Sequence, residues 1–181
     1  MRRALTHRLR EGVFASLLVL FLSLALAPAA TAHIVIQGDA GYVAKVEECL
    51  EKIAQSGGKA GANLTQLTNS NNVHTIKQNS GTSSCSPSNG TNATNGTGTG
   101  STTKWDPDLV TPVGGVQRDP CASLAHELDH AKHNDSGDND FTSTGHNGIP
   151  TAEIEACSTE NEYRKANGLP ERTTYGGKRL P

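Results

Sequence analysis

The sequence predicts a small α+β domain, with a short sheet, several helices and a long loop rich in Gly, Ser, Thr and Asn. Short apolar runs of strand length alternate with stretches whose apolar residues recur at helical spacing, and one central segment contains almost no apolar residues. With 181 residues, the chain is long enough for one domain with its own hydrophobic core.

Residues 1–32 have the organisation of a secretory signal peptide. Four arginines precede the apolar run VFASLLVLFLSLALAPAA, which leads to a small-x-small cleavage site that ends at Ala32. A retained membrane anchor is the alternative, but the run is short for a span and Pro28 closes it. Cleavage after Ala32 would deliver residues 33–181 as a secreted or periplasmic domain.

The charge of the chain argues against two classes of partner. The net charge is −2, and because the predicted leader is basic, the remainder is more acidic still. Nucleic acids and anionic membranes both require a basic face on the protein, so neither is expected as a partner after leader cleavage. We expect the domain to act as a monomer.

The first part of the mature domain predicts a strand, one or two helices and a second strand. HIVIQ (33–37) is an apolar run of strand length, and residues 42–55 place apolar side chains at helical spacing. SGGKAG (56–61) ends that helix, ANLTQLTN (62–69) is a candidate short helix, and NVHTIKQ (72–78) is a second strand.

Residues 79–103 are predicted to form a flexible loop or linker. They are almost all Gly, Ser, Thr and Asn, a composition that cannot bury enough apolar surface to fold. Asn-x-Thr sequons occur at Asn63, Asn89, Asn92 and Asn95. They matter only in a eukaryotic secretory pathway, and low complexity rich in Thr and Asn is the simpler interpretation.

Order is expected to resume with an extended segment, residues 104–118, that leads to two helices. Asp119 and Pro120 form a good helix start, and the helix should run to about His133. A second helix is predicted over 151–167, between a Pro-Thr start and a glycine stop.

The first of these helices carries HELDH (126–130), a pattern that can build a zinc site. His126 and His130 lie one turn apart on one face, so their imidazoles can share one tetrahedral ion. Glu127 is rotated away from the metal and can take the proton of an attacking water as a general base. The alternative is a set of solvated polar residues on an ordinary helix, and Asp129 is expected to face solvent.

An open zinc site needs a third protein ligand, which we expect from the second helix. Glu153 is the first choice, because it follows the second histidine by some twenty residues and shares a face with Glu160. Glu160 is the second choice and Glu155, on another face, the third. His146 stays possible, whereas His133 would have to bind from the same straight helix, over too wide an arc.

Four cysteines in an exported chain predict two disulfides, with three possible pairings. No two of them form a CxxC motif, so a cysteine zinc site is not expected. If Glu153 points at the metal, Cys157 points from the next turn towards the helix that begins near Cys121. This geometry favours a Cys121–Cys157 bridge and leaves Cys49 to pair with Cys85.

The order of motifs along the chain resembles that of a known family. WDP, RDP, LAHELDHA, EIEA, an E-N-x-x-R helix and GLPERTTYGG follow one another as in the NleD-type effector metallopeptidases and their relatives in bacterial polymorphic toxins. The early IQGDAGYVAKVEECLEKIAQ is also similar to the start of that domain, so the match covers nearly all of residues 33–181.

The resemblance implies a zincin-like metallopeptidase fold, a Zn²⁺ cofactor and cleavage of a protein or peptide substrate. It also implies that His126, His130 and a later glutamate bind the metal and that Glu127 is the base. The signal peptide and the four cysteines depart from the family, which leaves the substrate and the delivery route open.

Tyr175, in the last of these motifs, is a candidate hydrogen-bond donor to the oxyanion of the tetrahedral intermediate. The alternative is a tyrosine that packs the C-terminal tail with Arg172. Taken together, the sequence predicts a secreted zinc metallopeptidase that serves as an effector or toxin. A non-catalytic exported domain that binds zinc or a partner is the alternative.

Overall fold

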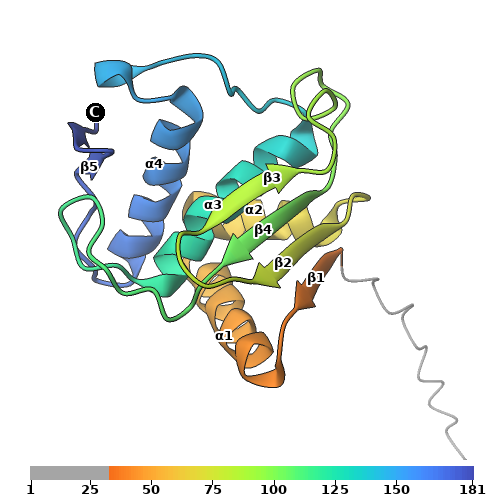
Figure 1. The fold of residues 1–181 in the computed structure, drawn as a ribbon, viewed down its shortest axis with the longest axis horizontal. Coiled ribbons are helices and arrows are strands. Elements are labelled where there is room, and N and C mark those ends of the chain that lie inside the picture. Colours follow the sequence, from red (N-terminus) through yellow and green to blue (C-terminus); the bar gives the residue numbers. More distant parts are fainter. Residues whose placement is uncertain (1–32) are drawn as a thin grey trace, which may run out of the picture. The chain divides into compact units, whose positions relative to one another are not determined.

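In the computed structural model, which describes residues 33–181, the chain forms a small α+β domain, as predicted (Figure 1). The predicted signal peptide, residues 1–32, lies outside the described residues. Within residues 33–181, no helix is long and apolar enough to span a membrane.

The helices are α1 (Ala40–Ser56), α2 (Gly58–Asn69), α3 (Pro120–Ser136), the 3-10 helix η1 (His146–Gly148) and α4 (Thr151–Ala166). The strands are β1 (Ile34–Gln37), β2 (His74–Gln78), β3 (Ser84–Pro87), β4 (Ser101–Trp105), β5 (Thr174–Tyr175) and β6 (Lys178–Arg179).

The main sheet has the strand order β1-β2-β4-β3. β1, β2 and β4 run parallel, with Ile36 opposite Ile76 and Ile76 opposite Thr103. β3 runs antiparallel to β4 at the edge, with Cys85 opposite Thr103. Because parallel neighbours need a crossover, α1 and α2 fill the connection from β1 to β2. β5 and β6 pair separately as a short antiparallel hairpin.

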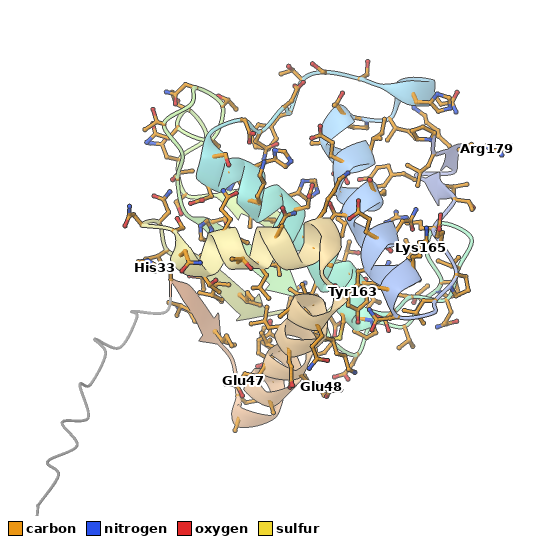
Figure 2. All side chains as sticks on the ribbon, turned by 180° about the vertical axis from the view of Figure 1, so that it is seen from behind. His33, Glu47, Glu48, Tyr163, Lys165 and Arg179 are labelled. Atoms are coloured by element: carbon orange, nitrogen blue, oxygen red, sulfur yellow. A yellow bond between two sulfur atoms is a disulfide. The ribbon has the colours of Figure 1, made fainter. Side chains whose placement is uncertain are left out.

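The core lies between the sheet and the helices. α3 contacts β3 and β4, and α2 crosses α3 and α4 and contacts both (Figure 2). Trp105, at the end of β4, is fully buried together with Ile53 and Leu124. The Trp105 indole Nε1 donates a hydrogen bond to the carbonyl oxygen of Pro120 at 3.0 Å. This bond fixes the start of α3 against the end of the sheet.

The start of α3 agrees with the sequence prediction. The side chain of Asp119 caps the helix by accepting a hydrogen bond from the backbone N–H of Ala122 at 2.7 Å, and Pro120 occupies the first turn. Gly137 ends the helix in the left-handed conformation, with φ of 74°. α3 therefore continues nearly one turn beyond His133, where the prediction ended it.

Residues 79–103 differ from the prediction of a flexible loop, because they contain β3 and most of β4. A Cβ at Gly98 would lie 2.0 Å from the carbonyl oxygen of Asp135, and one at Gly100 would lie 2.1 Å from that of Val73. The small residues of this segment therefore allow close backbone packing. The same composition had suggested a flexible loop.

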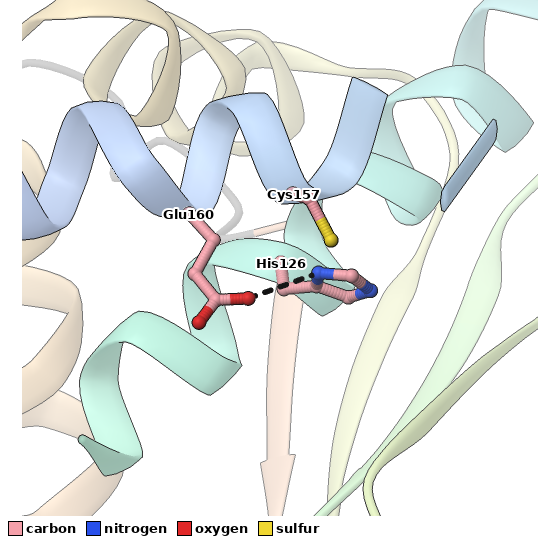
Figure 3. A group of neighbouring side chains, drawn as sticks. All are labelled: His126, Cys157 and Glu160. Carbon is pink, nitrogen blue, oxygen red and sulfur yellow. Dashed lines mark ion pairs between the residues drawn. The ribbon is translucent and has the colours of Figure 1, made fainter. Parts of the chain in front are cut away.

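The disulfide also differs from the favoured pairing. Cys49, on the buried face of α1, is bonded to Cys121 in the first turn of α3, with a Cα–Cα distance of 5.0 Å. Cys85 and Cys157 are free. The Cys121–Cys157 and Cys49–Cys85 pairings were therefore wrong, because the Cys157 side chain lies against His126 instead of the start of α3 (Figure 3).

We predict that the Cys49–Cys121 bond is a main contributor to stability. Replacing both cysteines with alanine should lower the free energy of unfolding by about 4 kcal/mol in the chain-entropy model, since the bond joins residues 72 apart in sequence. Urea unfolding with and without reductant measures the effect. Reductant should destabilise the native chain but not the double variant, and a peptide map of unreduced protein that joins Cys121 to Cys157 would contradict the structure.

Candidate metal centre

Two histidines of α3 and one glutamate of α4 bring their side chains to one point. Glu153 Oε2 lies 3.1 Å from His126 Nε2 and 3.6 Å from His130 Nε2. One potential ligand atom from each residue lies within 4.8 Å of the other two. The imidazoles come from successive turns of α3, and Glu153 comes from the first turn of α4. We call His126, His130 and Glu153 the metal cluster.

The two nitrogen–oxygen separations within the metal cluster are compatible with a tetrahedral zinc ion. With zinc–nitrogen and zinc–oxygen bonds of about 2.0–2.2 Å, two ligands of a tetrahedron stand roughly 3.4 Å apart. The two observed nitrogen–oxygen separations fall on either side of that value. Two imidazoles and one carboxylate are also a donor set of catalytic zinc sites, which leave the fourth position to water or substrate.

The electrostatics of the metal cluster favour a cation. Burial raises the pKa of Glu153, but His126 and His130 outweigh burial and hold it well below its usual range. Burial lowers the pKa of His126, whereas contacts with Cys157, Glu153 and Glu160 raise it well above its usual range. Groups that stabilise a proton on a buried imidazole are equally placed to stabilise a bound metal ion.

The other proposed third ligands lie elsewhere. Glu155 is half-exposed on another face of α4, and its Oε2 lies 3.5 Å from His133 Nε2. His133 Nδ1 in turn lies 2.9 Å from Asp138 Oδ1. His146 is exposed in η1. Among the described residues, none of Glu155, His133 and His146 joins the metal cluster.

Glu160 approaches the opposite side of the His126 ring. Its Oε2 lies 3.3 Å from Nδ1, whereas Glu153 approaches Nε2. Arg164 Nε and Arg172 Nη1 hold the Glu160 carboxylate at 2.8 Å and 2.9 Å. Burial raises the pKa of Glu160, but its contacts with His126 and Arg172 lower it to about 2. The carboxylate is therefore charged and already paired.

Glu127 lines the same cavity as the metal cluster. The cavity has a volume of about 540 Å³, and Glu127 is only 8% exposed. Burial raises the pKa of Glu127, although His126 and His130 pull it back in part. A carboxylate with a raised pKa accepts a proton more readily than an exposed one, which suits a general base in hydrolysis.

Tyr175, in β5, lines this cavity from the side of the C-terminal segment. Burial and the nearby Glu153 carboxylate raise the pKa of Tyr175 to about 12, so the phenol keeps its proton at neutral pH. The Arg172 guanidinium lies over the ring, 5.2 Å from its centroid. Tyr175 therefore packs with Arg172 and also faces the cavity, so both roles considered from the sequence are compatible with its position.

Cys85 lines the cavity as well, although the sequence carried no signal for it. It belongs to β3, inside the segment that was expected to be flexible. Arg118 is a further lining residue, and it donates hydrogen bonds to the carbonyl oxygen of Thr111 at 3.1 Å and to Ser123 Oγ at 3.3 Å. Arg118 is the first residue of the RDP motif, which by itself could not show that its side chain borders the cavity.

Asp129 is buried, which corrects the expectation that it faces solvent. Its Oδ1 accepts hydrogen bonds from Asn63 Nδ2 and from Thr159 Oγ1, both at 2.7 Å. These bonds join α2, α3 and α4 immediately beside the metal cluster. Asn63 is itself buried, so the sequon that it begins is inaccessible in the folded chain.

The fold and the cluster define the class of protein: a small α+β domain with a candidate centre for metal-dependent hydrolysis. The chain belongs to the peptidase family M91, described as effector proteins, whose family model matches residues 30–170. This match confirms the resemblance to the NleD-type zinc metallopeptidases that the motifs indicated. A comparison with curated proteins gives no significant match.

We predict that Glu153, and not Glu155, is needed for metal binding. Glu153→Ala removes the oxygen that lies between the two histidines and should weaken zinc binding strongly. Glu155→Ala is the matched control, because its side chain is half-exposed and contacts His133 instead. Zinc titration of both variants measures the difference. Release of zinc by Glu160→Ala or His146→Ala, with Glu153→Ala unaffected, would contradict this assignment.

Proposed function

We propose that the mature chain is an exported zinc-dependent endopeptidase of the H-E-x-x-H type, with His126, His130 and Glu153 as the metal ligands. The observation that carries this proposal is the convergence of the three side chains beside buried Glu127 in one cavity. Membership of a peptidase family supports the reaction class, and the ligand spacing supports zinc.

The chain's own residues supply proton transfer and positioning. When bound, zinc contributes Lewis acidity, which polarises the scissile carbonyl and favours attack by water near neutral pH. Glu127 takes the proton of the attacking water and then delivers it to the leaving nitrogen. Burial raises the pKa of Glu127, which makes the carboxylate a better acceptor for the proton of water than an exposed glutamate.

Tyr175 supplies a hydrogen bond to the negatively charged oxygen that develops during attack. Its phenol keeps its proton at neutral pH and lies in the same cavity. Such a donor acts more strongly on the developing charge than on the neutral carbonyl, which is the requirement for catalysis. Packing against Arg172 keeps the ring at the cavity wall.

The substrate is a protein or peptide, and the enzyme serves as an effector or toxin outside the cytoplasm that makes it. The family description supports the effector role. Export rests on the signal-peptide pattern of residues 1–32, and the Cys49–Cys121 disulfide supports an oxidising destination.

N-terminal sequencing of the exported protein should therefore give His33 as the first residue, and an unprocessed Met1 would contradict cleavage after Ala32.

The sharpest test of the mechanism is Glu127→Gln. The amide keeps the size of the side chain and leaves all three metal ligands in place, but it cannot accept the proton of water. We expect unchanged zinc content and unchanged folding, with peptidase activity reduced by about 10²- to 10⁴-fold. A peptide-library cleavage assay with parallel metal analysis measures both quantities.

Two outcomes of that experiment would redirect the assignment. Activity of Glu127→Gln near the native rate would remove Glu127 as the base. A native chain that folds fully without zinc and cleaves no peptide would favour the alternative, a non-catalytic exported interaction domain. Chelation that removes zinc and activity together, with recovery on zinc addition, would support the peptidase.

A further inference from the structure

The Nδ1 side of the His126 ring also faces buried residues, Cys157 and Glu160 of α4 (Figure 3). Glu160 Oε2 lies 3.3 Å from Nδ1, and the Cys157 sulfur, Glu160 and His126 offer ligand atoms within 4.8 Å of one another. The three residues are between 1% and 6% exposed. Nδ1 itself is buried and makes no well-directed hydrogen bond in the structure. A buried nitrogen that lacks such a bond, with a carboxylate beside it, requires an explanation.

Metal binding at the other ring nitrogen would make Nδ1 a donor that needs the nearby carboxylate as its acceptor. A neutral imidazole that uses Nε2 as a ligand carries its proton on Nδ1. A buried N–H without an acceptor would weaken metal binding by the cost of leaving it unpaired. Glu160 Oε2 is a charged acceptor at close distance, whereas the Cys157 sulfur is a weak one.

The same group of residues is unsuited to a second metal ion. Both oxygens of Glu160 are engaged, Oε1 by Arg164 and Oε2 by Arg172. Two guanidinium groups at these distances oppose a further divalent cation. They also fix the carboxylate in one orientation, because Arg164 and Glu160 are both 1% exposed and the pair cannot be solvated.

We propose that Glu160 is a positioning residue that accepts a hydrogen bond from the Nδ1–H of metal-bound His126 and thereby directs Nε2 at the metal. The proposal rests on the proposed function and deepens it. Partners of this kind fix the tautomer and orientation of metal-bound histidines and raise their basicity. Here the partner comes from α4, the same helix that supplies Glu153 to the other side of the ring.

The surrounding contacts hold this partner in place. Asn161 Nδ2 donates to the carbonyl oxygen of Arg172 at 2.9 Å, and the backbone N–H of Arg172 donates to Asn161 Oδ1 at 2.7 Å. This pair of hydrogen bonds fastens the segment after α4 onto α4, next to Glu160. The E-N-x-x-R and G-L-P-x-R motifs are therefore parts of one support for His126.

The test compares four variants by zinc affinity, measured by competition with a chromophoric chelator. Glu160→Gln replaces one of the two acceptor oxygens with an NH₂ group. One of the groups that the carboxylate pairs with, an arginine or the Nδ1–H of His126, then loses its acceptor. Glu160→Asp keeps the negative charge for the arginines but withdraws the oxygen from Nδ1, and it protects the test if the glutamine variant fails to fold. Cys157→Ala removes the other neighbour of the ring. Glu162→Gln is a control on the same helix, because Glu162 is partly exposed and pairs with Lys59 instead of His126.

We expect one zinc per chain and an affinity lower by roughly 10- to 100-fold in both Glu160 variants, with Cys157→Ala and Glu162→Gln close to native. The visible spectrum of the cobalt-substituted protein should also change in the Glu160 variants only. A purely structural Glu160 would instead lower the unfolding temperature of the metal-free chain and leave the affinity and the cobalt spectrum unchanged, which would overturn the proposal.

Three results would overturn it in distinguishable ways. Binding of two zinc ions, the second lost in Cys157→Ala, would make Glu160 and Cys157 ligands of a second site. A native chain that binds no zinc would remove the proposed function itself, and this result is seen before any variant is compared. Native zinc binding with unaffected Glu160 variants would instead leave the metal site intact and reject only the positioning role.

Discussion

The packing of α4 on α3 buries a negative charge, and the arrangement of the whole site depends on how that charge is neutralised. A buried carboxylate is costly unless it is paired and hydrogen-bonded. Glu160, 1% exposed, meets this condition through Arg164 from its own helix and Arg172 from the segment that follows. Because Arg172 must fold back onto α4, the C-terminal segment carries Tyr175 to the cavity wall. One ion-pair network, formed by Glu160, Arg164 and Arg172, thus determines both the charge beside the site and the path of the C-terminal segment.

The helix that carries the motif is fixed along its whole length. At its start, the disulfide of Cys121 and the hydrogen bond from Trp105 join it to α1 and to the end of β4. In its middle, Asp129 binds α2 and α4. At its end, Asp135 accepts hydrogen bonds from Gln66, at 2.9 Å, and from the connection between α2 and β2. A site held on rigid elements keeps its ligands near the geometry that a metal requires, which lowers the cost of binding.

The parts of the fold that the sequence predicted are those with a local physical signal. α1, α3 and α4 follow from helical spacing and from end signals such as the Asp119 cap. Helical spacing also predicted that His126 and His130 share a face, and Glu153 was expected on the second helix as their partner, where the three side chains do converge. Whether these residues act as predicted is a matter for metal binding and kinetics.

The features that could not be predicted from the sequence depend on contacts between segments that are distant along the chain. β3 and β4 are built from small polar residues, so neither hydrophobicity nor alternation marks them as strands. The Cys49–Cys121 bond depends on how α1 packs against α3, which no pattern in either helix specifies. The burial of Asp129 likewise depends on Asn63, a residue 66 positions earlier in the chain. In each case the partner, and not the local sequence, decides the structure.

The observed disulfide pairing has a chemical consequence for the metal centre. The bonded cysteines lie in α1 and at the start of α3, whereas the two free thiols, Cys85 and Cys157, both lie near the metal cluster. A thiol competes for zinc as the thiolate, and burial raises the pKa of Cys85 to about 11. Cys157 is 1% exposed, which shields it from exchange with the disulfide and from external oxidants. The raised pKa of Cys85 and the burial of Cys157 therefore weaken both thiols as competitors for the metal, and they favour the histidines and Glu153 as its donors.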